Sequence, residues 1–432
     1  MAELPDLPKG KEFEEYISAC FQCAGYYVAR NIIERQENEE ILELDIVATA
    51  YEKAQLKNLI IEAKAGYWGF SDIFKIKGWL NYLGYSYGLL ITNSKKENAT
   101  FYEDKAKEIG IRLFQITDLS KEPAILKEII PNCQLNKADF QMWRFSYWLE
   151  RKLLSDLKRW KKKFSGTEKR CYKQLDEYYF LLNSGIFFTK SIPKRVRKLY
   201  ETFELFPRIS ARCGNEMIGK SFDEDVEQLP REIYSATYYD CEYNVVQVSA
   251  FIEHRARLAL LKSATDYILE REKRGNKNFD KKYKKQLLSF LPQSFINGIE
   301  ELSKHKYFYK YPVFWQWFMW LMGGFILLDY ESQEYDILSD KSGIPVNEIP
   351  NALRSYEILF PQEKGWFIDL TESNIKVLKV FPLPFSGVGA NFRRVIYTRS
   401  QKFEDLNISG KHTLSDLIKW NNLSVEVLED DA

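Results

Sequence analysis

The chain of 432 residues exceeds the usual size of a single domain, so we expect two or three domains with sizeable cores. Its hydrophobic share of 45% and charged share of 28% are those of an ordinary soluble protein, and its opening segment has no apolar signal-peptide core, which argues against export. The formal net charge of +1 conceals an acidic front, because residues 1–120 hold 14 Lys and Arg against 19 Asp and Glu.

The cysteines predict no zinc site. Only Cys20 and Cys23 form a close pair, within a helical pattern, and no second pair of Cys or His stands at ligand spacing. We interpret them as reduced, buried thiols of a cytoplasmic protein.

The front of the chain alternates between helical and strand patterns. The expected elements are a helix over 10–25, strands over 26–30, 41–50 and 58–66, a helix over 70–84, a strand over 87–93, a helix over 99–110 and a strand over 111–117. The polar segments 33–40 and 51–57 are expected to be connections. This order predicts an α/β domain over 8–125 with a mixed sheet flanked by helices, whose first strands pair antiparallel because their connections are short.

The remainder predicts a large, mostly α-helical domain over 138–330 and a small strand-containing C-terminal part over 331–432. Within the latter, 336–359 could form a helical module, and 365–370, 375–381 and 392–398 look strand-like. The apolar segment 311–330 has an uncharged core that reaches the lower length limit of a membrane span. We favour a buried helix or helix pair there and keep membrane contact as the alternative.

Charge interrupts the two most strand-like segments of the front domain. If the strands over 41–50 and 58–66 form a hairpin centred between Lys53 and Ala54, Asp45 lies directly opposite Glu62. Residues two apart share a strand face, so Lys64 lies beside Glu62. Two such close carboxylates repel each other, and a divalent cation between them removes that cost.

These residue types suit phosphodiester hydrolysis. Carboxylate oxygens are suitable ligands for Mg²⁺ or Mn²⁺. The cation would polarise a phosphodiester and activate a water, while the Lys64 ammonium could orient that water or stabilise the developing charge. The structural alternative is that Asp45 is a strand-end residue and that Glu62 and Lys64 form a surface pair. The unbroken apolar run 59–61 argues against it, because such a run implies burial on both faces of the strand.

The pattern resembles the PD-(D/E)xK nuclease superfamily. An aspartate in "LDIVA" is followed on the next strand by "IIEAK", and "GKEFEEYISACFQCAGYYV", "LLITNS" and "KAKEIGIRLFQITDL" stand in the order of Mrr-type restriction endonuclease domains. The resemblance covers residues 8–120 and implies Asp45 and Glu62 as metal ligands and Lys64 as a catalytic residue. It also implies Glu14 as a further catalytic residue and ligand, with Glu15 as the alternative. No proline precedes Asp45, where the superfamily name would place one.

Basic clusters in the second part predict nucleic-acid binding. Residues 150–200 hold 15 Lys and Arg against five Asp and Glu, and 271–285 hold eight against two. A solvated helix face or a flexible loop is the alternative explanation. The candidate contacts are Lys75 and Lys77 in the front domain and Lys158, Arg159, Lys161, Lys162, Lys163, Arg195 and Arg197 in the helical domain.

The sequence therefore predicts a cytoplasmic, Mg²⁺-dependent endonuclease for which we favour DNA as the substrate and keep RNA as the alternative. By resemblance, such architectures serve restriction or anti-phage defence, with a homo-oligomer or a defence-system protein as the partner. Two alternatives remain open: an inactive nuclease fold that only binds nucleic acid, and a membrane-associated defence effector.

Overall fold

The chain forms two compact units in the computed structural model. The described residues are 9–37, 39–52, 55–116, 136–163, 166–184, 191–201, 241–275, 279, 290–361, 365–370, 375–378 and 383–398. The first unit draws on Met1–Trp148 and Asn183–Ile192, and the second on Leu149–Leu182 and Pro193–Leu406. The boundary predicted near residue 331 lies inside the second unit.

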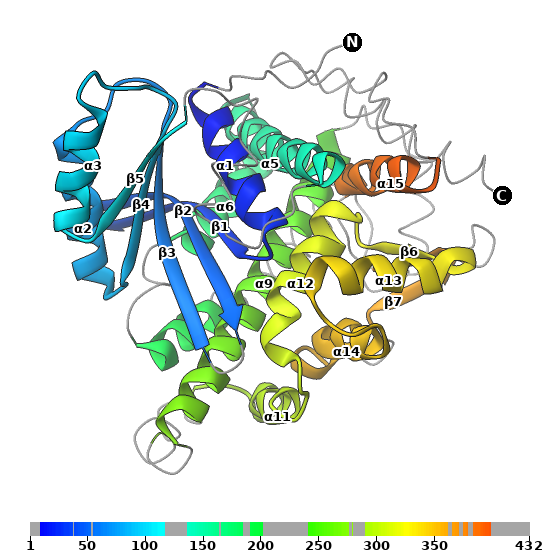
Figure 1. Ribbon diagram of the computed structural model, residues 1–432. Helices are drawn as coiled ribbons and strands as arrows, with labels where there is room; N and C mark the ends of the chain where they lie inside the picture. The colour runs from blue at the N-terminus through cyan, green and yellow to red at the C-terminus, as the bar shows by residue number, and fades with distance from the viewer. Residues whose placement is uncertain are drawn as a thin grey trace. The chain divides into compact units, whose positions relative to one another are not determined.

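A five-stranded mixed sheet forms the centre of the first unit (Figure 1). Its strands, in the same order in space as along the chain, are β1 (Tyr27–Gln36), β2 (Glu39–Glu52), β3 (Gln55–Lys64), β4 (Tyr87–Thr92) and β5 (Ile111–Gln115). The first three strands pair antiparallel, and the last three pair in parallel. The predicted mixed sheet with antiparallel first strands is therefore confirmed.

The sheet is flanked by α1 (Lys11–Cys23), α2 (Phe70–Leu83) and α3 (Ala99–Glu108). Because α2 and α3 each join two parallel strands, right-handed crossovers place both on one side of the sheet, and Figure 1 shows α1 on the other. Phe13, Ile17 and Phe21 of α1 are fully buried, as their helical spacing predicted.

The polar segments expected as connections are largely strand. β1 and β2 continue to Gln36 opposite Glu39, and the pair Arg35–Glu40 lies across this end at 3.5 Å. β2 and β3 likewise extend to Glu52 and Gln55. The expectation failed because polar residues are stable at the exposed end of a hairpin, where backbone bonds and cross-strand charge pairs replace burial.

The second unit is mostly helical, as predicted. Its helices are the later part of α5 (Lys137–Lys163), α6 (Gly166–Leu182), α9 (Cys241–Arg274), α11 (Gln293–Leu302), α12 (Tyr311–Gln316), α13 (Glu331–Ser342), α14 (Ile349–Leu359) and α15 (Leu383–Thr398). A small antiparallel sheet has the strand order β6 (Phe325–Leu327), β8 (Ile375–Leu378), β7 (Phe367–Leu370).

The strand predicted over 392–398 is wrong, because these residues form the end of α15. Phe385, Val388 and Phe392 stand at helical spacing and are buried. The segment 392–398 by itself does not contain the first two of these positions. Its aromatic and β-branched residues therefore favour a strand when the segment is considered alone.

Residues 311–326 of the apolar segment 311–330 lie in the core of the second unit. α12 continues into a π-helical turn over Trp317–Leu321, and the side chains of both are buried. Trp315 stacks on Tyr356 with 3.7 Å between ring centroids and donates a hydrogen bond to Ser355 Oγ at 2.7 Å. The predicted buried helix is confirmed, and no helix in the described part of the chain is long and apolar enough to cross a membrane.

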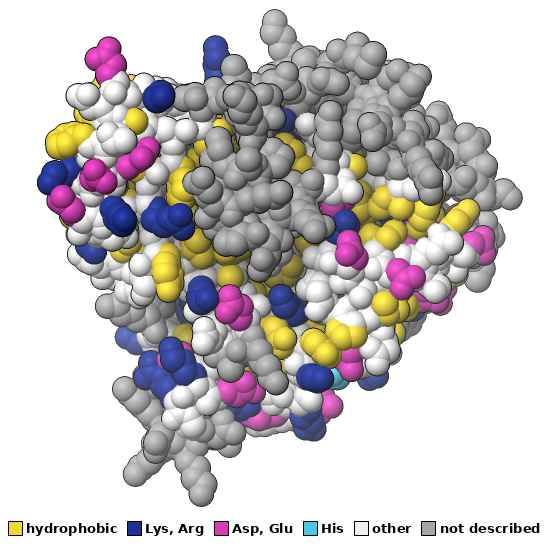
Figure 2. Space-filling model, in the orientation of Figure 1, with side chains coloured by type: hydrophobic (Ala, Val, Ile, Leu, Met, Phe, Trp, Pro, Cys, Tyr) yellow, Lys and Arg dark blue, Asp and Glu magenta, His cyan; other side chains and the backbone are white. Residues whose placement is uncertain are grey.

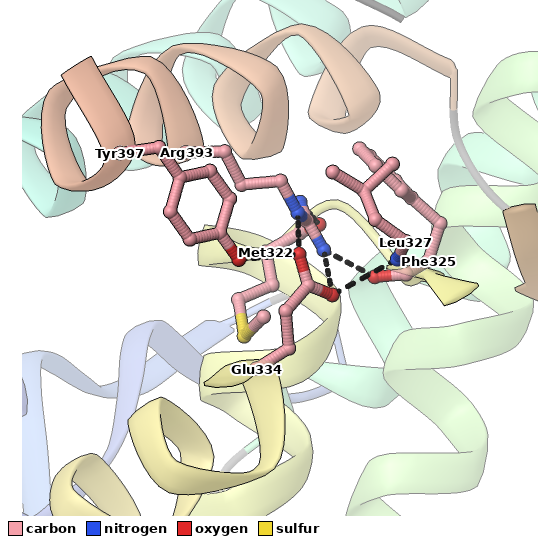
Figure 3. Close-up of polar contacts among 6 residues, drawn as sticks. All are labelled: Met322, Phe325, Leu327, Glu334, Arg393 and Tyr397. Carbon is pink, nitrogen blue, oxygen red and sulfur yellow. Dashed lines mark hydrogen bonds and ion pairs between the residues drawn. The ribbon is translucent and has the colours of Figure 1, made fainter. Parts of the chain in front are cut away.

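A buried ion pair ties α13 to α15 in the same unit (Figure 3). Glu334 is fully buried and Arg393 is 2% exposed, and the guanidinium donates to the carboxylate and to the Met322 carbonyl. The two Glu334 oxygens also accept hydrogen bonds from the Leu327 backbone N–H and the Tyr397 hydroxyl. Both oxygens of this carboxylate therefore have partners.

Candidate active site

The β2–β3 hairpin places Asp45 across from Glu62. The paired register ends at Ile46 opposite Ile61, and one further step puts Asp45 opposite Glu62, as the sequence predicted. At this point the Asp45 carboxylate accepts a hydrogen bond from the backbone N–H of Ala63 at 3.0 Å. The side chain thus closes the end of the ladder, and this fixes its position beside β3.

Glu62 is fully buried, and its two oxygens have different surroundings. Oε1 lies 2.6 Å from Nζ of Lys64 and 3.3 Å from Nζ of Lys75. Oε2 has no hydrogen-bond partner among the described residues. A buried carboxylate oxygen without a partner is costly, and a bound cation would remove that cost.

Burial and mutual repulsion together determine the charge state of this cluster. Burial and the negative charges of Glu62 and Glu14 raise the pKa of Asp45 to about 8. The hydrogen bond from the Ala63 N–H and the positive charge of Lys64 oppose this shift. Burial also raises the pKa of Glu14; Arg30 and Lys11 oppose the shift, and Glu43 and Glu62 add to it. At neutral pH and without a cation, the Asp45 carboxyl group is therefore mostly protonated.

Lys64 carries a positive charge at the centre of the site. Burial lowers the pKa of this lysine, but the hydrogen bond and charge of Glu62, with the charges of Asp45 and Asp72, raise it overall. The Lys64 side chain is 30% exposed, and its amine also lies 3.8 Å from Asp72 Oδ1. It can therefore donate to a phosphate or a water while it remains an ammonium ion.

Asp72 is a part of this arrangement that the sequence reasoning missed. Its other oxygen accepts a hydrogen bond from the Gly69 backbone N–H at 2.9 Å and caps the start of α2. The signal was present, because an acidic residue in the first turn of a predicted helix is a common cap. Its link to Lys64 depends on the path of the 65–69 loop, which no local pattern specifies.

Glu14 and Glu15 have different surroundings on α1. Glu15 is 3% exposed and lies 3.8 Å from the Arg30 guanidinium, which covers the ring of Tyr147 at 4.5 Å. Glu14 is partly exposed and contributes to the electrostatics of Asp45. Glu14 is accordingly the better candidate for the site, and Glu15 belongs to a structural ion pair.

The carboxylates fit a hard divalent cation in chemistry. Asp45, Glu62 and Glu14 supply oxygen donors of the kind that Mg²⁺ and Mn²⁺ prefer, and Oε2 of Glu62 is a buried oxygen in need of a partner. Within the described residues, however, no three His, Cys, Asp or Glu side chains lie close enough together to hold a metal ion as they stand. A cation would have to draw these carboxylates together.

The two lysines predicted on α2 lie at different ends of the sheet. Lys75 reaches Glu62 and covers the ring of Trp79 at 4.4 Å. The Lys77 amine lies next to Gly110, just before β5, at the end of the sheet opposite to Lys64. Only Lys75 is thus in the neighbourhood of the carboxylates.

Most of the basic side chains predicted as contacts in the second part fall outside the described part of the structure. The side chains of Lys158, Arg159, Lys161, Lys162 and Lys163 lie outside the described part of the structure. Arg195 is 6% exposed and pairs with Asp266 at 3.2 Å, so it belongs to the core and fits a phosphate contact poorly. Arg197 is exposed, pairs with Glu201 at 2.7 Å and lies over the Phe290 ring.

Comparison with known protein families supports this picture of the first unit. Residues 8–122 match the family model of the Mrr catalytic domain, described as a restriction endonuclease. This part of the chain is thus an Mrr-type, PD-(D/E)xK-like, nuclease-like domain, and the match includes the whole five-stranded sheet and all four predicted catalytic residues. No match was found among curated proteins or among solved structures.

Proposed function

We propose that this protein hydrolyses phosphodiester bonds in DNA with the help of Mg²⁺ or Mn²⁺. The observation that carries the proposal is the state of Glu62. It is fully buried, lies beside Lys64 and across from Asp45, and keeps one oxygen without a partner, within a domain of the restriction endonuclease type.

Each residue has a separate task in this proposal. Asp45, Glu62 and Glu14 would hold the cation, and Asp45 would lose its proton when the cation arrives. Lys64 would orient the attacking water and donate to the phosphate as its charge grows. A divalent cation at this place supplies Lewis-acid polarisation of the phosphodiester and activates water.

The wider role follows from the domain type by analogy. Restriction or anti-phage defence is the biological context that we propose, with the helical unit contacting nucleic acid, another copy of the chain or a defence-system protein. Arg197, which is exposed, and the basic run 158–163 remain the candidate contacts in that unit.

Cleavage assays test the proposal directly. The full-length protein is incubated with circular DNA, linear DNA and RNA in Mg²⁺, Mn²⁺ or EDTA, beside Lys64→Ala and Glu62→Gln. We expect metal-dependent cleavage of DNA and a loss on the order of a hundredfold to a thousandfold in both variants. Lys57→Ala is the matched control, because Lys57 lies on the same strand and pairs with Glu52 at 3.1 Å. Equal cleavage by wild type and Lys64→Ala would place the activity elsewhere.

One observation favours a second candidate function. Two ammonium groups already occupy Oε1 of Glu62, so the carboxylate is partly neutralised without a metal ion. A binding module with an inactive nuclease fold would have this character. Such a protein would retard labelled DNA in a gel and leave it uncut with every divalent cation.

A further inference from the structure

A group of four aromatic side chains, three exposed and one half-buried, lies next to the proposed site. It consists of Tyr67, Phe70, Phe74 and Phe101, which we name the aromatic patch. Tyr67 is 90% exposed, Phe74 is 61% exposed and Phe101 is 51% exposed. Phe70 and Phe74 are one helical turn apart on α2 and share a face, and the ring centroid of Phe70 lies 5.8 Å from that of Phe101 on α3. The patch therefore spans the first turns of two helices and the loop 65–69.

The patch rests on a well-packed base. Trp68 is fully buried and its indole N–H donates to the Ser94 carbonyl at 2.8 Å. The Phe70 ring stacks on Tyr102 with 4.6 Å between centroids. Because the residues between and beneath the exposed rings are packed, the exposure of Tyr67 and Phe101 is a property of the folded unit.

The loop that carries Tyr67 begins at the proposed catalytic lysine. Tyr67 is the third residue after Lys64, so their Cα atoms are at most about 11 Å apart. Asp72, two residues after Phe70, returns to within 3.8 Å of the Lys64 amine. A strand whose phosphate lies at Lys64 would therefore have its neighbouring nucleotides over the patch.

The charge around the patch suits a polyanion. Nζ of Lys96 lies 4.5 Å from the centroid of the Tyr67 ring. Residues 65–108 hold six Lys against five Asp and Glu, so this segment lacks the acidic excess of residues 1–120. Figure 2 shows basic, acidic and apolar side chains interspersed on the surface over α2 and α3. This surface combines rings with nearby ammonium groups, which is the combination that single-stranded nucleic acid requires.

We propose that the aromatic patch binds unstacked nucleobases of the strand that is cut, beside the scissile phosphate. This inference rests on the proposed function and narrows its substrate to DNA that is single-stranded or locally unpaired. Aromatic rings bind bases by stacking, which aliphatic side chains cannot do. Of the six exposed large hydrophobic residues described in the first unit, five are aromatic and only Ile41 is aliphatic. Together with the Lys96 ammonium beside the Tyr67 ring, that composition favours a nucleic acid over an apolar protein surface as the occupant.

Equilibrium binding in EDTA tests the inference without cleavage. The probe is fluorescein-labelled single-stranded DNA of mixed sequence, compared with the same strand carrying a central run of abasic sites. We expect the full-length protein to prefer the strand with bases. The variant Tyr67→Ala/Phe101→Ala should bind that strand about tenfold to a hundredfold more weakly and bind the abasic strand unchanged.

Two further variants control for folding and for loss of any exposed ring. Tyr67→Phe/Phe101→Tyr keeps both rings and should bind like the wild type. Tyr87→Ala removes a ring that is also 51% exposed, but at the start of β4, five residues before the strand end that lies beside Lys64. It should leave binding unchanged.

The outcomes separate this inference from the nuclease proposal. Base-dependent binding that disappears in the double variant supports base binding by the patch, even if the protein does not cleave DNA with any divalent cation. Metal-dependent cleavage together with equal binding of both strands by wild type and double variant overturns the patch alone. Loss of self-association in sedimentation, with unchanged DNA binding, would show that the patch is an interface between copies and would also overturn it.

Discussion

Glu62 in the first unit and Glu334 in the second are both fully buried carboxylates next to basic side chains, yet their surroundings differ. Glu334 has partners at both oxygens, from Arg393, Leu327 and Tyr397. Glu62 has two ammonium groups at one oxygen and no hydrogen-bond partner at the other. A satisfied buried ion pair is a structural tie, whereas an incompletely satisfied one is a place where a ligand can bind.

The basic partners differ in the same way. Arg393 is 2% exposed and donates to the backbone carbonyls of Met322 and Phe325 besides Glu334, so it is fixed within the core. The side chains of Lys64 and Lys75 are 30% and 39% exposed, so they lie near water and can turn toward a phosphate. The comparison therefore predicts that changes at Glu334 affect stability, and that changes around Glu62 affect binding and catalysis.

The largest expected effect follows from neutralising the satisfied carboxylate. Glu334→Gln leaves the buried Arg393 guanidinium without its counter-charge, and we expect the free energy of unfolding to fall by about 3–5 kcal/mol. Urea unfolding measures this loss. Glu62→Gln should change the same quantity by less than about 1 kcal/mol, because its lysines can be solvated. Equal losses in the two variants would remove the distinction between the sites.

A surface pair on the same helix provides the control. Asp340 is in α13, its side chain is 75% exposed, and it lies 3.2 Å from Lys341. Asp340→Asn should therefore alter the unfolding free energy by no more than about 0.5 kcal/mol.

Of the two carboxylate sites, only the one around Glu62 could be predicted from the sequence. The register of Asp45 opposite Glu62 follows from counting across a short turn, and the alternation of strand residues places Lys64 beside Glu62. The element order of the first unit follows from apolar periodicity at α1, α2 and the central strands. These signals are local, so they are visible in the chain itself.

Contacts between distant segments were not predictable. Arg393 stands in a stretch that resembled a strand, and nothing near it in sequence points to Glu334, which lies 59 residues away. Lys75 was expected to contact a phosphate, and its position at Glu62 depends on how α2 packs over β3. Arg195 looked like part of a basic surface, but tertiary packing with Asp266 buries it.

The second prediction concerns the pH dependence of the incompletely satisfied site. The pKa of Asp45 is about 8 in the folded, metal-free protein, whereas an aspartate in the unfolded chain titrates near pH 4, as model peptides do. Between these values the folded state holds a proton that the unfolded state has lost, so stability falls as the pH rises from about 4 to about 8.

Asp45→Asn should remove this fall. In EDTA at pH 9 we expect the variant to be more stable than the wild type by roughly 2 kcal/mol, with a smaller difference at pH 5. Urea unfolding across this pH range measures the effect. Added Mn²⁺ should stabilise the wild type more than the variant, because only the wild type keeps all of the proposed ligands. Parallel stability curves for the two proteins would show that Asp45 does not experience the charge of its neighbours.

The smallest expected effect comes from Lys75, whose ammonium lies beside Oε1 of Glu62, while the proposed cation would bind Oε2 of the same carboxylate. Its ammonium lies 3.3 Å from Oε1 and repels a metal ion, so Lys75→Ala should bind Mn²⁺ more tightly, by about threefold to tenfold in isothermal titration calorimetry. Lys77→Ala is the matched control, because the Lys77 amine lies at the other end of the sheet beside Gly110. Weaker Mn²⁺ binding in Lys75→Ala would mean that this lysine holds Glu62 in place for the ion. Lys75 would then have a structural role at Glu62, as Arg393 has at Glu334.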